Sequence, residues 1–173
     1  PYLATDFEIT GSSFTNVFTG VDIRGSVDGL TISGNTFGPM DLVDCTLAAS
    51  GIYLGDGPAN LSIDDVLVSS NTFTSYCRGF YMWEYRDAST IGSVSVSGNS
   101  FTNSIYSSGI RMIAGMPGSA DTTTMSGPVS IDDNTFTQST PIINGAGVAM
   151  VDVRVLEPTS ALSITNNEIT FSG

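Results

Sequence analysis

Carboxylates are the side chains of this chain that could perform acid–base chemistry, because the sequence contains no histidine and no lysine. The absence of histidine excludes the usual nucleophilic triads and removes the commonest general base. Two adjacent acidic pairs remain, Asp64–Asp65 and Asp132–Asp133, and paired carboxylates are what glycoside hydrolysis needs. The first pair directly precedes an apolar alternation and the second fills a turn, so we expect both to be solvated. The sequence leaves enzymatic activity open but favours its absence, with no catalytic residue.

Aromatic side chains form a second group, which could bind sugar rings. In FYMWEYRD at 80–87 the residues Tyr81, Trp83 and Tyr85 recur with a period of two, so a strand would turn them to one face. Tyr53 and Arg111 occupy the position of Tyr81 in neighbouring copies of a repeat. These five residues are the predicted contacts to a carbohydrate or to another subunit. An aromatic patch of this size can also be covered by a loop of the same chain.

The elements that position these side chains are repeated. LTISGNTF at 30–37 returns as VLVSSNTF at 66–73, VSVSGNSF at 94–101 and VSIDDNTF at 129–136, with related copies at 7–14 and 162–169. Each copy has two apolar residues one apart, which predicts a strand with one buried face. The copies end in an aligned asparagine and an aligned phenylalanine. The asparagines are Asn35, Asn71, Asn99, Asn134 and Asn167, and the phenylalanines are Phe37, Phe73, Phe101 and Phe136.

A second motif, glycine-apolar-x-apolar, alternates with the first. Its copies begin at Gly20, Gly51, Gly79, Gly109 and Gly147. Aligned on the glycine, one outward row reads Asp22, Tyr53, Tyr81, Arg111 and Ala149, and the next reads Arg24, Gly55, Trp83, Ile113 and Val151.

Each predicted strand resembles the strand two places further along the chain. This similarity favours a β-solenoid, in which each repeat is one coil and equivalent strands stack. An antiparallel sandwich is also rich in short strands, but it does not require this similarity. We therefore expect an all-β chain with about six coils, forming a single domain over residues 1–173.

The pattern apolar-x-apolar-x-x-Asn-x-Phe, followed by Gly-Ile-x-Leu, resembles the repeat of the pectin-lyase-like superfamily over residues 7–171. The resemblance implies a right-handed parallel β-helix with an asparagine ladder in its turns and a phenylalanine ladder in its core. It further implies that each asparagine adopts a positive φ, which asparagine tolerates well. Lyases of this family use an arginine base beside calcium held by aspartates, and no local motif of this chain matches that arrangement. No cofactor is therefore expected, and calcium held by aspartates belongs only to the alternative of a carbohydrate-binding or carbohydrate-cleaving β-helix.

The two cysteines occupy matching connections of neighbouring repeats. Cys45 lies between Phe37 and Gly51, and Cys77 lies between Phe73 and Gly79. The spacing of stacked coils, about 4.8 Å, is within the range that a disulfide bridges. The sequence favours a Cys45–Cys77 bridge over two buried thiols. It predicts no metal site, because two cysteines without histidine give too few ligands.

The net negative charge of the chain limits the molecules that it can bind. The net charge of −12 comes from 17 acidic residues against five arginines, and such a chain cannot build the basic patch that nucleic acid needs. No apolar run is long enough to span a membrane. We expect an extracellular or cell-surface location.

The repeats run from Phe7 to Phe171 without a capping helix, although solenoids usually protect their open ends. The chain is thus expected to be a fragment of a longer β-helix or to stack on copies of itself through its ends or side faces. The favoured function is an extracellular structural module of a sheath, surface layer, fibre or adhesin. The alternative is a β-helix that binds or cleaves polysaccharide.

Overall fold

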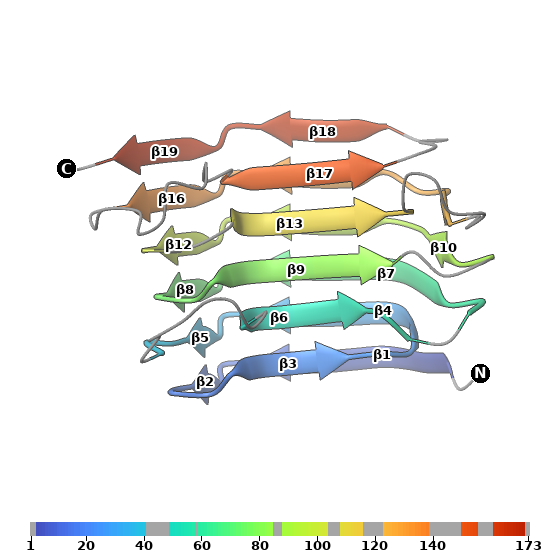
Figure 1. Cartoon of the computed structure of the whole chain (residues 1–173), viewed down its shortest axis with the longest axis horizontal. Helices are drawn as coiled ribbons and strands as arrows, with labels where there is room; N and C mark the ends of the chain where they lie inside the picture. The colour runs from blue at the N-terminus through green and yellow to red at the C-terminus, as the bar shows by residue number, and fades with distance from the viewer. Residues whose placement is uncertain are drawn as a thin grey trace.

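The computed structural model describes residues 3–40, 49–57, 59–84, 88–103, 108–115, 123–138, 150–155 and 161–171. These residues form strands and no helix, arranged in three parallel sheets (Figure 1). The chain passes from sheet A to sheet B to sheet C and then returns to sheet A. This arrangement fits the predicted all-β solenoid.

Each sheet contains strands that come from successive repeats of the chain. Sheet A comprises β1 (Leu3–Thr10), β4 (Ser26–Ser33), β7 (Ser62–Ser69), β11 (Val94–Ser97), β15 (Val129–Asp132) and β18 (Leu162–Thr165), with β10 (Thr90–Ile91) and β14 (Thr124–Met125) beside them. Sheet B comprises β2 (Ser13–Phe14), β5 (Thr36–Phe37), β8 (Thr72–Thr74), β12 (Ser100–Thr102), β16 (Thr135–Gln138) and β19 (Glu168–Phe171). Sheet C comprises β3 (Thr19–Ile23), β6 (Ser50–Gly55), β9 (Arg78–Glu84), β13 (Ser108–Ala114) and β17 (Val151–Val155).

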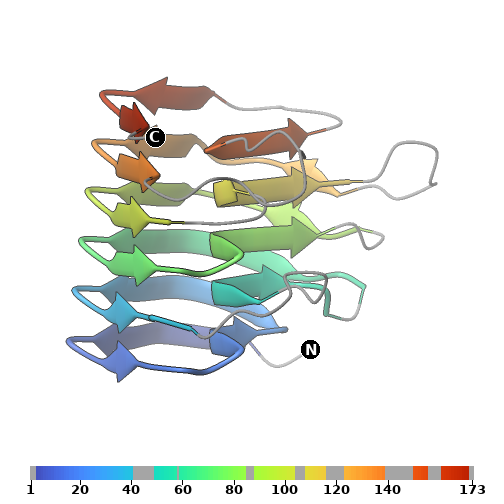
Figure 2. The same ribbon diagram turned by 60° about the vertical axis from the view of Figure 1, so that its left-hand side comes forward.

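The register stacks equivalent residues of the first repeated motif. In sheet A, Leu30 pairs with Val66, Val66 with Val94, and Val94 with Val129. The same alignment holds in sheet B, whose strands lie one above another in Figure 2. Identical inward positions therefore meet in space, as the repetition predicts.

The core contains a stack of phenylalanine rings. Neighbouring rings along the stack lie 4.7 to 4.9 Å apart between centroids and are 3° to 8° from parallel. Phe14 lies at one end of this stack, which continues through Phe37, Phe73, Phe101 and Phe136. Such close and parallel stacking keeps successive coils in the same orientation.

The asparagines form a hydrogen-bonded ladder at the turn from sheet A to sheet B. The backbone N–H and Nδ2 of Asn71 both donate to Oδ1 of Asn99, at 2.9 and 3.0 Å, and Asn71 Nδ2 also donates to the carbonyl of Ile32. The same pattern joins Asn35 to Asn71 and Asn99 to Asn134. Each amide thus ties its turn to the coils on either side.

The prediction that these asparagines adopt a positive φ is wrong. The left-handed conformation falls on the residue before each asparagine, which is Gly34, Ser70, Gly98, Asp133 or Asn166. The physical reason is that the asparagine side chain must turn inward to bond the backbone, and Asn35, Asn71, Asn99 and Asn134 are buried. The sharp bend is taken by the preceding residue.

The expected register of the last strand of sheet C is also wrong. Arg111 pairs with Asp152 rather than with Ala149, and Ile113 pairs with Arg154 rather than with Val151. The reason is that Val151 and Val153 continue the inward positions of Ile110 and Met112. Gly147 and Ala149 lie outside the described residues.

Candidate functional site: the arginine–aromatic face of sheet C

The outward row of sheet C gathers charged and aromatic side chains from five coils. In register, Asp22 pairs with Tyr53, Tyr53 with Tyr81, Tyr81 with Arg111, and Arg111 with Asp152. The alternation of inward and outward residues along each strand brings these side chains to one face. We call this row, together with Arg24, Arg78, Trp83 and Arg154, the arginine–aromatic face.

The two described tyrosines of this face are buried. Tyr53 is 7% exposed and Tyr81 only 2%, whereas Trp83 is half-buried. Tyr53 and Tyr81 meet edge to face with centroids 5.3 Å apart, and Trp83 lies 5.8 Å from Tyr81. The rings therefore cover one another, and burial raises the pKa of both tyrosines. Tyr85 lies outside the described residues.

Arginines lie over the tyrosine rings. The guanidinium carbon of Arg78 is 4.3 Å from the Tyr81 centroid, and that of Arg111 is 5.7 Å from the same ring. Arg24 lies 5.3 Å from the centroid of Tyr53. These distances are those of cation–π interactions. Four of the five arginines of this acidic chain thus belong to one face.

Aspartates neutralise most of these cations. Asp22 lies 2.9 Å from Nε of Arg24, and its hydrogen bond and charge raise the pKa of that arginine. Asp152 contacts both Arg111, at 3.3 Å, and Arg154, at 2.9 Å. The face is therefore close to charge balance, whereas the chain as a whole is strongly negative.

Sequence reasoning missed Arg78. This residue aligns with Thr19, Ser50 and Ser108, directly before the glycine of the second motif. A charged residue in a position that otherwise holds small hydroxyl side chains is the signal that could have revealed it.

Comparisons identify no relative. No family model, curated protein or solved structure matches the chain. The resemblance to the pectin-lyase-like repeat therefore depends on the motif alone.

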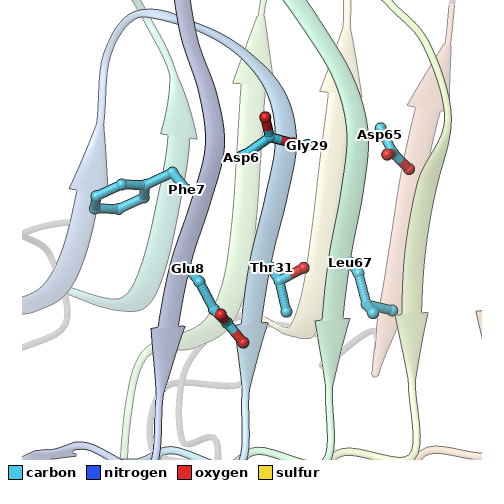
Figure 3. Close-up of a pocket in the computed structure, with 7 residues that line it drawn as sticks. All are labelled: Asp6, Phe7, Glu8, Gly29, Thr31, Asp65 and Leu67. Carbon is cyan, nitrogen blue, oxygen red and sulfur yellow. The ribbon is translucent and has the colours of Figure 1, made fainter.

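An open cavity of about 420 Å³ lies on a second face, outside the first three coils of sheet A. Its lining residues are Asp6, Phe7, Glu8, Gly29, Thr31, Asp65 and Leu67 (Figure 3). Figure 3 shows the carboxylates of Glu8 and Asp65 well apart from each other. Among the described residues no group of three or more carboxylate or cysteine side chains could hold a metal ion. The cavity therefore offers no metal centre, and the possible use of calcium stays a prediction.

The carboxylates of the two acidic pairs accept different hydrogen bonds from neighbouring residues. Asp64 accepts hydrogen bonds from the backbone N–H of Ser93 at 2.6 Å and of Asp65 at 2.8 Å. It lies inside β7, so the expectation that it precedes the strand is wrong, because β7 begins at Ser62. Asp132 accepts from Thr165 Oγ1 in the neighbouring coil, and Asp133 takes the positive φ of the turn. Each pair thus supports its local backbone.

Replacing Asp64 with asparagine should reduce the acid sensitivity of the fold. The hydrogen bonds from Ser93 and Asp65 lower the pKa of the Asp64 carboxyl. A carboxyl with a lowered folded-state pKa stabilises the fold above its unfolded value, about 3.9, and this stability is lost as the pH falls through the folded pKa. Urea denaturation at pH 6 and below pH 4 should show a smaller drop for Asp64→Asn than for the wild type. Asp65→Asn, which removes an exposed carboxylate without these contacts, should keep the wild-type drop; an equal change in both variants would contradict the assignment.

The remaining predictions concern the cysteines and the membrane. Cys77 is buried, but Cys45 lies outside the described residues, so the bridge stays a prediction. No helix in the described part of the chain could span a membrane.

Proposed function

We propose that this chain is a right-handed parallel β-helix of six coils, of the pectin-lyase-like type, that stacks end to end. It serves as an extracellular structural module, in a sheath, surface layer, fibre or adhesin. The observation that carries the proposal is the exposure of inward-facing apolar residues on the first and last coils.

The exposed residues are the same repeat positions that form the core elsewhere. Leu30, Ile32 and Phe73 in the inner coils are 0% exposed. On the end coils, Phe7 is 47%, Leu162 45%, Ile164 48%, Ile169 51% and Phe171 61% exposed. Apolar surface of this kind gains about 25 cal/mol per Å² when it is covered. A further coil is the partner whose shape and hydrogen-bonding pattern fit both ends.

The register of the inner coils supplies the geometry of the contact. Leu162 and Ile164 pair with Val129 and Ile131 on their inner side. A second copy placed on the outer side would set its Phe7 and Ile9 against Leu162 and Ile164, and its Phe14 against Ile169. Because the two ends are different surfaces, this contact does not close and generates a filament.

The asparagine ladder gives the stack a direction. Each Oδ1 accepts from the backbone N–H of the preceding coil, as Asn167 does from Asn134. The same polarity would turn the N–H of Asn167 toward Ser12 of the next copy, which occupies the asparagine position of the first coil. The free strand edges of β1, β18 and β19 would pair in the same contact.

Electron microscopy and light scattering over a concentration series test the stacking. The chain should form rods whose mass rises with concentration, and Ile164→Asp should reduce it to a monomer. Leu67→Asp is the matched control, because Leu67 is also an exposed apolar residue of sheet A but lies on the side of the rod. A folded wild type that stays monomeric at every concentration would rule out the proposal, as would equal loss of assembly in both variants.

Polysaccharide binding or cleavage remains the second candidate, and the arginine–aromatic face favours it. Trp83 is half-buried beside Tyr81 and Arg111, and exposed aromatic surface with nearby polar groups suits sugar rings. Glycan pull-down with the wild type and Trp83→Ala tests this function: retention that is lost in the variant supports it. Equal retention by both proteins would exclude the face as the binding site.

A further inference from the structure

Arg78 is a charged side chain without a counter-ion among the described residues. Its Nε and Nη1 atoms are buried and have no hydrogen-bond partner. None of the salt bridges described for the chain includes it. Its contact is with the face of the Tyr81 ring, at 4.3 Å.

This arrangement is costly for the protein alone. A guanidinium that loses part of its hydration without gaining a counter-ion is destabilising. Burial accordingly lowers the pKa of Arg78, and the positive charge of Arg111 adds to this effect. Two guanidinium groups thus approach one tyrosine ring in a chain with only five arginines.

The neighbouring aspartates already contact other arginines. Asp22 and Asp56 lie beside Arg24, and Asp152 lies between Arg111 and Arg154. Arg78 is therefore the positive charge that the described aspartates of this face do not balance. One further negative charge would restore the balance of the described groups on this face.

We propose that Arg78, seated on Tyr81 beside Arg111, is a binding site for a carboxylate ligand. A guanidinium donates charge-assisted hydrogen bonds to a carboxylate and matches its single charge. A phosphate dianion would exceed the charge to be balanced. The ring of Trp83, 5.8 Å from that of Tyr81, offers an apolar wall to the organic part of the ligand.

The site lies on the side of the solenoid and does not depend on stacking of the ends. It gives the polysaccharide candidate a ligand class, an acidic sugar, and it accommodates a free organic acid equally. The experiment must therefore separate the carboxylate from the sugar.

Trp83 is the single tryptophan of the chain, so its fluorescence reports on this site. Titration with sodium acetate, at ionic strength held constant with sodium chloride, should give a saturable change in the wild type. Arg78→Gln should weaken the apparent affinity at least tenfold. Leu67→Glu is the matched control, because Leu67 is an exposed residue of sheet A outside this face and the change lowers the net charge by one, as Arg78→Gln does; it should titrate like the wild type.

Glucuronate and glucose distinguish the sources of the carboxylate. Binding of acetate and glucuronate without glucose supports the carboxylate site. Binding of glucose as tightly as glucuronate would overturn it while leaving the polysaccharide candidate intact. A wild type that responds to none of the three, or an Arg78→Gln variant that titrates unchanged, would also overturn it.

Thermal melting separates a ligand site from a structural role. Without carboxylate, Arg78→Gln should melt at or above the wild-type temperature, and acetate should raise the melting temperature of the wild type alone. If Arg78→Gln fails to fold, Arg78→Lys keeps the charge and removes the planar fork, and its acetate affinity should still fall. A wild type insensitive to acetate with a destabilised Arg78→Gln would make the arginine structural and end the proposal.

Discussion

Asn99→Ala is expected to lower the free energy of unfolding by about 4 kcal/mol, because several buried groups would lose their partners at about 1–3 kcal/mol each. Oδ1 of Asn99 accepts from the backbone N–H and from Nδ2 of Asn71. Its Nδ2 donates to the carbonyl of Val68 and to Oδ1 of Asn134. Alanine removes all four contacts, and the site is too deeply buried for water to replace them freely.

Urea denaturation followed by circular dichroism measures this loss, and the melting temperature should fall by about 10 °C. Asn16→Gly is the matched control. Asn16 is exposed and adopts a φ of 53°, which glycine also adopts, so its replacement should change stability by less than about 0.5 kcal/mol. If both variants lose the same stability, the ladder contributes no more than a surface turn.

The repeated strands could be predicted from sequence because stacking imposes identity on inward positions. Leu30, Val66, Val94 and Val129 lie opposite one another in sheet A, so each must fit the space left by its neighbours. A one-residue slip would turn the whole strand inside out. The periodicity therefore predicted the inward positions of the first repeated motif.

The exposure of outward residues could not be predicted in the same way. Alternation indicates that Tyr53 and Tyr81 point away from the interior of the coil, but it does not indicate which side chains then cover them. Tyr81 contacts Arg78, Arg111 and Trp83, which come from different coils or different positions in the strand. Contacts between non-equivalent positions of the repeat produce no recurring pattern in the sequence.

The register of β17 shows how a local cue can mislead. Alignment on the glycine of the second motif selected Gly147, whereas the strand pairs through Val151 and Val153. The segment VDVR at 151–154 repeats VDIR at 21–24, and both place an aspartate beside an arginine at 2.9 Å. Strand pairing follows the inward valines, because burial contributes more than the placement of one glycine.

The inward and outward residues of the strands have different consequences for function. Inward residues are alike because they stack, and at the two ends they become the proposed contact surface. Outward residues differ between coils, and Arg78 is the clearest departure from its aligned partners. Substitutions in the ladders should therefore change stability, whereas substitutions on the arginine–aromatic face should change binding.

Phe101→Ala is expected to cost about 3–5 kcal/mol, the usual cost of removing a buried aromatic ring. Phe101 is fully packed, and its ring lies 4.7 Å from that of Phe73 and 4.9 Å from that of Phe136. Phe18 provides the control because it is exposed, so Phe18→Ala should cost about 1 kcal/mol or less. Chemical denaturation of both variants gives the comparison, and equal costs would show that the stack is not tightly packed.

A double variant tests whether the ring of Phe101 lies beside Gly79, as the structure places it. A Cβ on Gly79 would lie 2.3 Å from Cε1 and 2.4 Å from Cδ1 of Phe101, so Gly79→Ala alone should cost about 1–3 kcal/mol through overpacking. With Phe101 already replaced by alanine, the clash with the ring is removed, and only the contact with the carbonyl oxygen of Gly109 at 2.8 Å remains. Gly79→Ala should then cost at least about 1 kcal/mol less than it does alone. Gly25→Ala, whose Cβ would meet nothing within 4 Å, should show no such coupling; strictly additive costs at Gly79 and Phe101 would mean that the ring does not occupy this position.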